Sequence, residues 1–290
     1  MSAAPAVPQG PGPAGGHGLT GVADAGAFLA RLVRLDPAAL VRLRPASPPA
    51  APDARAPGAP ASPGGPAART ALWARLPWGV LAVRTVAGAG CGDATVPARE
   101  LLAGLAAGED ALPARRDAQW RWPLPPPASR PVELLPAGEL WRIAEAAAGA
   151  LREAAAHGVA GRAVGQRALR DALLDHVAVV VTPEDPPGPP VEITQRVVQG
   201  VIRMGFLGRP GDADPPAVTP PAVTPPAVTP PAVDPTAVAS ADSAVAAGFG
   251  GDVQVRVAGQ WVGLVGPYGA VWSQKVSKLA VTPLGIQPKV

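Results

Sequence analysis

Apolar residues recur at helical spacing in several parts of the chain. A stripe of Phe and Leu behind Asp24, a favoured N-cap residue, predicts a helix over residues 24–35. Thr95 with Pro97 in the following turn predicts that a second helix begins at Thr95. Three further stretches carry the same spacing, and they cover residues 138–157, 164–176 and about 191–206.

Alternating and continuous apolar runs predict the strands. Residues 71–76 and 80–85 flank Pro77-Trp78-Gly79, so they are predicted to pair as a β-hairpin. The valine-rich run 177–181 is typical of an inner strand. Short extended segments are also predicted at residues 40–44 and 119–122. A three-stranded meander is predicted from residues 253–257, 261–265 and 271–274, and its short strands require support from the preceding body.

These elements predict an α+β fold, in which mostly antiparallel strands pack with about four to five helices. The 290 residues include 40 Pro and 34 Gly, yet 48% are apolar and seven are Trp, which indicates one folded unit with long Pro/Ala-rich disordered inserts. The predicted parts are a disordered N-terminus (1–22), an α+β domain (23–209) with a flexible loop (46–68), a repeat linker (210–248), and a meander with a basic tail that completes the domain (249–290).

The linker contains a tandem repeat of Pro-Pro-Ala-Val-Thr between residues 215 and 238. A period of five matches neither a helix nor a strand, so the repeat cannot bury one face and is predicted to be an extended polyproline II spacer. It is either a ligand for a domain with a proline-binding groove or an insert in a tolerant loop. The repeat has no aromatic or basic anchor, which favours the insert.

Composition excludes several classes of protein. The single cysteine, Cys91, excludes an internal disulfide framework and any multi-cysteine zinc site. Residues 1–18 lack the basic and apolar regions of a secretory signal, and no run of about 18 apolar residues occurs to span a membrane. We therefore expect a cytoplasmic protein without a membrane partner.

Titratable residues are few, and none forms a familiar catalytic motif. Asp171, Asp175 and His176 lie close together at the end of a predicted helix, but no second His or Cys follows at metal-ligand spacing. A surface helix end, with Arg167 or Arg170 pairing a carboxylate, accounts for this group. His157 is similarly accounted for at the end of the helix 138–157.

Two further candidates are explained without a ligand. Cys91 stands among Gly88, Gly90 and Gly92, whose spacing matches no phosphate-binding motif, so the glycines are predicted to connect a hairpin to a helix. His17 falls in the N-terminus that is predicted to be disordered. The sequence thus predicts no catalytic residue, no metal site and no cofactor, and it favours a protein that is not an enzyme.

The net charge of +3 is carried by the C-terminal part of the chain. Residues 250–290 contain four cations and one anion, whereas the first 249 residues contain equal numbers of both. Trp261, Tyr268 and Trp272 lie in the same part. Cations beside aromatic residues are typical of nucleic-acid contacts, and equally of a protein surface with core tryptophans.

The predicted helix 191–206 carries a polar face. Glu192, Arg196, Gln199 and Arg203 are spaced four, three and four apart, and Arg and Gln are side chains that read base edges in a major groove. Helices followed by a basic helix and a hairpin resemble a winged-helix module over residues 138–274. This resemblance implies that the last helix enters the groove and that the hairpin contacts the DNA backbone. The departures are a strand and a Pro-rich loop before the basic helix, and the repeat after it.

A second resemblance covers most of the ordered chain. The segments 36–45 and 72–80, together with the absence of Asn and the three Lys against 22 Arg, are similar to a family of high-GC actinobacterial proteins without an assigned function. This resemblance implies a real fold and carries no activity.

The leading hypothesis is a non-enzymatic cytoplasmic binding protein associated with DNA. The alternative is a protein-interaction or scaffold protein that uses exposed Trp surfaces and Pro-rich segments. The sequence leaves the oligomeric state open. The candidate nucleic-acid residues are Arg196, Gln199, Arg203, Arg256, Lys275 and Lys278. The candidate interaction residues are Trp120, Trp122, Trp261 and Trp272.

Overall fold

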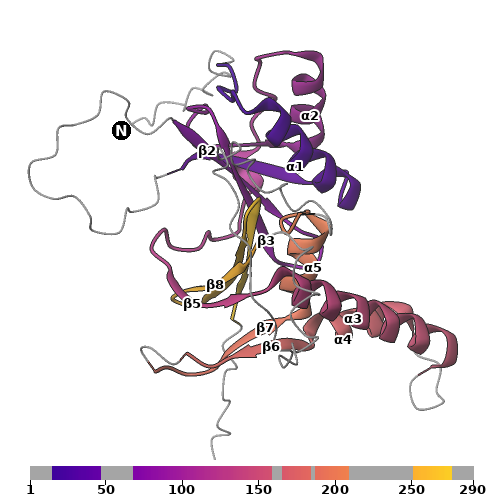
Figure 1. Cartoon of the computed structure of the whole chain (residues 1–290). Helices are drawn as coiled ribbons and strands as arrows, with labels where there is room; N and C mark the ends of the chain where they lie inside the picture. Colours follow the sequence, from indigo (N-terminus) through magenta and orange to yellow (C-terminus); the bar gives the residue numbers. More distant parts are fainter. Residues whose placement is uncertain (1–14, 47–67, 159–164, 184–186, 209–250, 276–290) are drawn as a thin grey trace, which may run out of the picture.

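The computed structural model describes residues 15–46, 68–158, 165–183, 187–208 and 251–275, and it confirms the α+β fold class (Figure 1). The first half of the chain comprises α1 (Val22–Leu35), β1 (Leu40–Pro45), β2 (Arg69–Arg75), β3 (Leu81–Ala87), β4 (Ala94–Pro97) and α2 (Ala98–Ala107). The second half comprises β5 (Arg130–Leu135), α3 (Ala137–His157), α4 (Gln166–Asp175), β6 (Val177–Val181), β7 (Val191–Thr194), α5 (Gln195–Arg203), β8 (Val253–Ala258), β9 (Trp261–Gly266) and β10 (Gly269–Gln274).

An eight-stranded antiparallel sheet joins the two halves in the order β4-β1-β2-β3-β10-β9-β8-β5. Each half contributes a three-stranded meander, β1-β2-β3 or β8-β9-β10, and an edge strand that leads directly into a helix, β4 into α2 or β5 into α3. The order is therefore the same from either edge of the sheet. A two-fold axis between β3 and β10 would exchange the two halves.

The seam between the halves is the pairing of β3 with β10. It comprises three residue pairs, from Ala270 opposite Val83 to Trp272 opposite Leu81. Next to the seam, the buried rings of Phe28 in α1 and Phe206 after α5 stack with their centroids 6.3 Å apart. The halves are thus joined through both the sheet and the helical layer.

One face of the sheet, the helix face, is covered by α1, α2 and α5 and holds the main core. Leu72 of β2, Val198 of α5 and Leu264 of β9 are fully buried there. Gly200 lets α5 approach β10 closely, since a Cβ at this position would lie 2.8 Å from Cγ1 of Val271. Burial of these aliphatic side chains is the main stabilising contribution to the fold.

The helices α3 and α4 lie beside this core and extend away from it, at the lower right of Figure 1, with the two-stranded sheet of β6 and β7 to their left. The prediction that residues 177–181 form an inner strand is wrong. Within the described residues β6 pairs with β7 alone, and Val180 is 56% exposed. A valine-rich run indicates a preference for the strand conformation, but it does not by itself show that both faces of the strand are buried.

Three predicted boundaries are corrected. The first helix begins at Val22, two residues before the expected cap Asp24. Thr95 does not cap α2, because it lies inside β4, where its backbone pairs with Arg42 of β1. The expected helix 191–206 is a strand followed by a helix, since residues up to Thr194 pair with β6 and α5 begins at Gln195.

The prediction of a disordered start over 1–22 is wrong for its described part, residues 15–22. Gly16 bridges to Ala111, and His17 is buried, with Nε2 3.1 Å from the Glu109 carbonyl and Nδ1 accepting from the Leu19 amide. Gly88 explains this packing, because a Cβ there would lie 2.4 Å from the Gly18 carbonyl oxygen. The glycine loop is therefore shaped by the N-terminal segment that it contacts.

The other predicted strands and helices, 40–44, the hairpin, 138–157, 164–176 and the meander, are confirmed with small shifts at their ends. The structure adds β5, which the sequence reading missed. Residues 119–122 are not a strand, since a 3-10 turn covers Asp117–Gln119 and an irregular segment follows. The predictions for residues 1–14, 47–67 and 209–250, and for the tail beyond 275, lie outside the described residues.

Candidate binding surface

The second face of the sheet, the open face, is aromatic and cationic. Trp261 and Trp272 form a separate cluster with Leu81, Ala258 and Ala270, against which Trp73 packs. Arg42, Arg44 and Arg75 alternate with core residues along β1 and β2, so their side chains also project from this face. Trp272 lies directly over Gly263, where a Cβ would be 2.5 Å from the indole ring.

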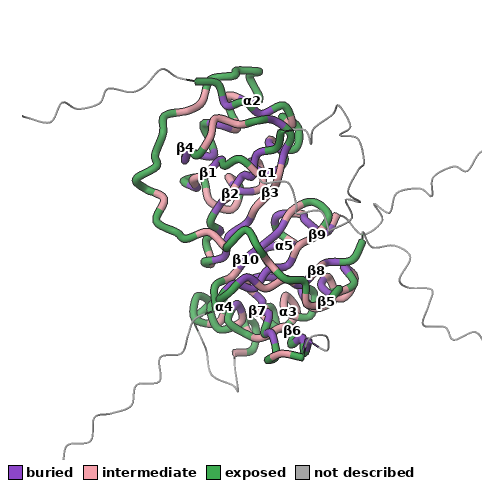
Figure 2. The backbone as a smooth tube through the Cα atoms, turned by 90° about the vertical axis from the view of Figure 1, so that its left-hand side faces the viewer, coloured by how far each residue is buried: buried purple, intermediate pink, exposed green. Residues whose placement is uncertain are grey.

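Among the described residues, an irregular segment between α2 and β5, residues 108–129, crosses the open face. Figure 2, which views the molecule from this side, shows it running outside the sheet and passing in front of β10, largely exposed. Trp120 packs on the cluster of Trp261 and Trp272, and its Nε1 donates a 2.8 Å hydrogen bond to the Trp122 carbonyl. This bond fixes the Trp120 indole against the backbone of Trp122.

Two arginines flank these indoles. The guanidinium carbon of Arg75 lies 3.9 Å from the centroid of the Trp122 ring, and that of Arg42 lies 5.9 Å from the centroid of Trp120. Cation–π contacts at such distances orient both partners. We call Arg42, Arg75, Trp120 and Trp122 the Trp–Arg surface. Its exposed members are Arg75 and Trp122, the indole of which is 37% exposed.

A groove of about 160 Å³ runs beside this surface. Leu40 and Pro77 give it an apolar lining, and Arg75 and Trp122 lie beside them. Asp36 also lines it, but its Oδ1 accepts a 2.9 Å hydrogen bond from the Ala38 amide and so serves the local turn. The groove therefore combines an apolar strip with a cation at its edge.

Asp93 anchors one end of the Trp–Arg surface. It accepts two hydrogen bonds from Arg42, at 2.6 and 2.7 Å, and Arg44 lies 3.2 Å away. The hydrogen bond from Arg42 holds the pKa of the Asp93 carboxyl below its usual value and raises the pKa of Arg42. The backbone amide of Thr95 in β4 donates a 2.7 Å hydrogen bond to Oδ1 of Asp117, which holds the crossing segment to this strand.

Arg75 differs from Arg42 because no hydrogen bond or ion pair is recorded for it among the described residues. Burial lowers the pKa of Arg75, since its partial dehydration disfavours the charged form. The stacked ring of Trp122 is its recorded partner. A guanidinium that has lost part of its water without gaining a carboxylate partner is well suited to donate hydrogen bonds to an incoming anion.

The four predicted interaction residues all lie on the open face. Trp120 and Trp122 are in the crossing segment, whereas Trp261 and Trp272 lie beneath it and are 6% and 7% exposed. The exposed surface therefore rests on a tryptophan base. Sequence reasoning missed Arg42 and Arg75, and the only available signal for a basic aromatic surface was the alternation Trp120-Arg121-Trp122.

The predicted nucleic-acid residues do not share one surface. Glu192, which was grouped with them, lies in β7 and not in the helix. Arg196 is a structural clamp, because it donates to Asp175 Oδ1 and to the Trp78 carbonyl, both at 2.6 Å. The bond from Arg196 lowers the pKa of Asp175, and Asp175 raises the pKa of Arg196.

The other nucleic-acid candidates lie farther along the chain. Gln199 and Arg203 are neighbours on α5, with Oε1 and Nε 3.5 Å apart. Arg256 projects from the open face of β8 and donates to the hydroxyl and carbonyl oxygens of Ser129. Lys275 follows β10, with its amide bonded to the Gln260 carbonyl, and Lys278 lies outside the described residues.

The titratable residues singled out in the sequence do not converge. Asp171 pairs with Arg167, as expected for a surface helix, and His176 is exposed after α4. Burial raises the pKa of the Cys91 thiol, which keeps it protonated and weakly nucleophilic. Across the described ranges, no group of three or more His, Cys, Asp or Glu is placed to hold a metal ion.

No helix in the described part of the chain is long and apolar enough to cross a lipid bilayer.

The chain belongs to the family described as a domain of unknown function (DUF8185), whose model matches residues 124–278. A second model, likewise described as a domain of unknown function (DUF8010), matches residues 19–122. The boundary between the two models coincides with the boundary between the two halves of the sheet. The search of curated proteins and the search of solved structures gave no match.

Proposed function

We propose that this member of the DUF8185 family is a cytoplasmic binding protein that acts by holding an acidic segment of a partner protein on the Trp–Arg surface. The bound segment lies in the groove beside Trp122, with apolar side chains over Leu40 and Pro77 and a carboxylate on Arg75. No chemical step is part of this proposal.

The pair of Arg75 and Trp122 is the observation that carries the proposal. The guanidinium is stacked at 3.9 Å on the indole, is partly dehydrated, and has no carboxylate partner among the residues described. Stacking leaves the edge of the guanidinium free to donate two parallel hydrogen bonds, which matches the geometry of a carboxylate. Trp and Arg are also the side chains that most often dominate the free energy of binding at protein interfaces.

The tryptophan base supports the proposal in a second way. Trp120 is fixed by its hydrogen bond to the Trp122 carbonyl and by packing on the cluster of Trp261 and Trp272. Little side-chain entropy is therefore lost when a partner covers this surface. An interface built on such a base is pre-organised.

Association with DNA remains the competing proposal. It relies on Arg196, Gln199 and Arg203, of which Arg196 is engaged with Asp175 and the Trp78 carbonyl. Arg256 belongs to the opposite side of the sheet from α5. One duplex would therefore contact only part of this set, and DNA binding predicts an affinity that falls steeply with salt.

The test is a titration of the full chain with three fluorescent probes, followed by anisotropy. The probes are an extended peptide alternating Glu and Leu, the same peptide with Lys in place of Glu, and a DNA oligonucleotide. We expect the acidic peptide to bind best, and Arg75→Gln or Trp122→Ala to weaken it by about tenfold, the loss of roughly one charge-assisted contact.

Arg69→Gln is the matched control, because Arg69 lies at the other end of β2 on the same face and carries the same charge. It should leave binding of the acidic peptide unchanged. Equal loss in Arg69→Gln and Arg75→Gln would reduce the effect to net charge and contradict the proposal. Binding of the oligonucleotide alone, lost in an Arg203→Ala variant, would establish the competing one.

A further inference from the structure

The helix face contains a larger cavity, distinct from the Trp–Arg surface, where the two halves of the chain meet. This cleft has a volume of about 500 Å³, within the roughly 300–1,000 Å³ range of small-molecule sites. The first half contributes α1 and β3, and the second half contributes α3, α5 and the turn between β9 and β10. Its lining residues are Ala27, Arg31, Arg84, Trp141, Ile202, Gly205, Gly208 and Tyr268.

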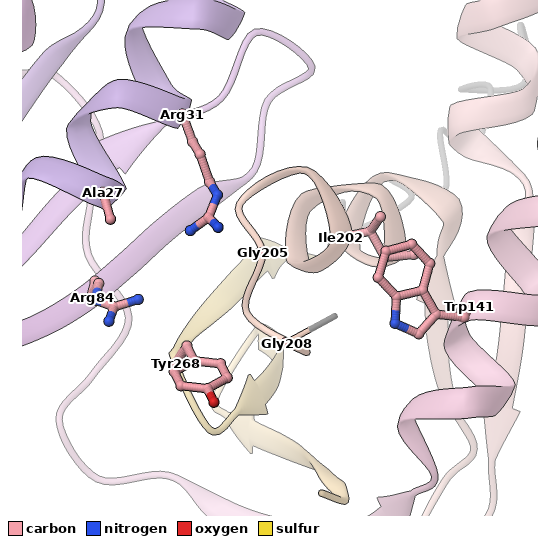
Figure 3. A pocket seen from close by; sticks show the side chains of 8 residues that line it. All are labelled: Ala27, Arg31, Arg84, Trp141, Ile202, Gly205, Gly208 and Tyr268. Atoms are coloured by element: carbon pink, nitrogen blue, oxygen red, sulfur yellow. The ribbon is translucent and has the colours of Figure 1, made fainter. Parts of the chain in front are cut away.

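Polar and aromatic groups of both halves face each other across the cleft. Figure 3 shows the guanidinium groups of Arg31 and Arg84 on one side, Tyr268 below them, and Trp141 on the opposite wall. The Arg84 guanidinium carbon lies 5.9 Å from the centroid of the Tyr268 ring, so cation and ring are adjacent. The side chain of Arg84 is only 12% exposed.

Two glycines shape the wall of this cleft. Gly205 and Gly208 have φ values of +68° and +76°, a conformation that favours glycine. A Cβ on Gly205 would lie 2.6 Å from the guanidinium carbon of Arg31, and one on Gly208 would lie 3.3 Å from the Tyr268 ring. The turn after α5 thus makes room for an arginine and an aromatic ring, and directs them toward the space between the halves.

We propose that this cleft binds a small organic oxyanion, a phosphate or carboxylate attached to a planar ring. Arg84 and Arg31 hold the oxyanion, and the phenol of Tyr268 and the indole of Trp141 contact the ring. Paired arginines supply charge-assisted hydrogen bonds to either oxyanion, and aromatic walls bind the planar part. The site depends on both halves, since the first half supplies the two arginines and the second half supplies the two aromatic side chains.

Asp24 of α1 competes with the ligand for Arg84. Its Oδ1 lies 2.6 Å from the Arg84 guanidinium, and its side chain is 59% exposed. An oxyanion must share Arg84 with this carboxylate or displace it. Removing the charge of Asp24 therefore strengthens oxyanion binding, whereas removing Arg84 weakens it.

The test measures binding to the full chain by isothermal titration calorimetry with four probes. Adenosine 5′-monophosphate and 4-hydroxybenzoate combine a ring with a phosphate or a carboxylate, while inorganic phosphate and adenosine each supply one part. We expect at least one combined probe to bind, and to bind more tightly than either single part. Binding of adenosine 5′-monophosphate would identify the oxyanion as a phosphate, and binding of 4-hydroxybenzoate would identify it as a carboxylate.

The variants separate binding from structural support. Arg84→Met should weaken the bound probe at least about tenfold, and Asp24→Asn should tighten it about threefold or more. Both variants break the same ion pair, so a purely structural Arg84 predicts the same change for both. Tyr268→Ala should weaken the combined probes and leave inorganic phosphate unchanged, and it provides a test that keeps Arg84 in place.

Arg34→Gln on the exposed side of α1 is the charge control and should bind as the wild type. Arg75→Gln should also leave the probes unaffected, since it lies on the other face of the sheet. The proposal is overturned if no probe binds the wild-type chain, or if Asp24→Asn and Arg84→Met change the affinity in the same direction.

Discussion

The two faces of the central sheet are covered in different ways. Three helices pack on the helix face, where aliphatic side chains such as Leu72 and Leu264 are fully buried. In the part of the chain that the structure describes, one irregular segment crosses the open face, and there Trp120 packs on Trp261 and Trp272. The same strands therefore present a dry aliphatic core on one side and an aromatic, cationic surface on the other.

This difference indicates which parts of the fold stabilise it and which are accessible to a partner. A helix covers a sheet with a continuous stripe of side chains, so the core under the helices stabilises the fold, and access to this face is confined to the cleft between the halves. An irregular segment covers only where individual side chains reach, which leaves Arg75 and Trp122 at the edge of a groove. Substitutions in the buried core should therefore affect stability most, and those at exposed positions of the Trp–Arg surface should affect binding.

The largest effect is expected for Phe206→Ala on the helix face. Phe206 is fully buried and stacks on Phe28 across the two halves, so its loss leaves a cavity at their junction. We expect the free energy of unfolding to fall by about 3–5 kcal/mol, measured by urea denaturation. Val180→Ala, at an exposed position, should change it by less than about 0.5 kcal/mol. Equal effects of the two would contradict the assignment of the core.

A smaller effect is expected for Gly263→Ala on the open face. The new Cβ would lie 2.5 Å from the Trp272 ring, which must move and disturb the tryptophan base. The expected loss of stability is about 1–3 kcal/mol. Gly26→Ala is the control, since no atom lies within 4 Å of its Cβ and alanine favours the helix α1. Unchanged melting of Gly263→Ala would show that the base is loosely packed.

The smallest effect is expected at Asp93, and it depends on pH. Because Arg42 lowers the pKa of Asp93 from 3.8, the carboxylate stabilises the fold above this value, and the contribution is lost as the pH falls through the lower value of the folded state. The side chain is 43% exposed, so water screens the pair. In thermal unfolding experiments, Asp93→Asn should melt below the wild type at pH 7 and approach it toward pH 3. A constant difference between the two at both pH values would contradict this prediction.

Local patterns predicted much of the fold. The spacing of Leu140, Ile143, Ala147 and Leu151 indicated α3, of which Leu140 is buried. The turn at Pro77-Trp78-Gly79 indicated the hairpin of β2 and β3, and both features depend on neighbouring residues. The strand β5 was missed because Pro131 and the prolines before it read as a loop, although proline is compatible with an edge strand such as this one.

The error at β7 has another physical cause. Ile193 and Val197 are spaced for a helix, but Val191 and Ile193 are equally spaced for a strand, and pairing with β6 decides between them. The sites depend still more on tertiary contacts. Trp120 and Trp122 were visible as candidates, while Arg75 reaches Trp122 across 46 intervening residues, a separation that no local pattern reports.

The seam between β3 and β10 has a consequence for the dynamics of the chain. It contains three residue pairs, against seven between β2 and β3 and six between β9 and β10, so it is the narrowest join in the sheet. Cooperative units of a protein open first where they share the fewest contacts. Amide hydrogens of Val83 and Trp272, which point across the seam, should therefore exchange faster than those of the meander interiors. A ligand that contacts both Arg84 and Tyr268 would hold the two halves together across this seam. Slower amide exchange between β3 and β10 would therefore show that the cleft is occupied.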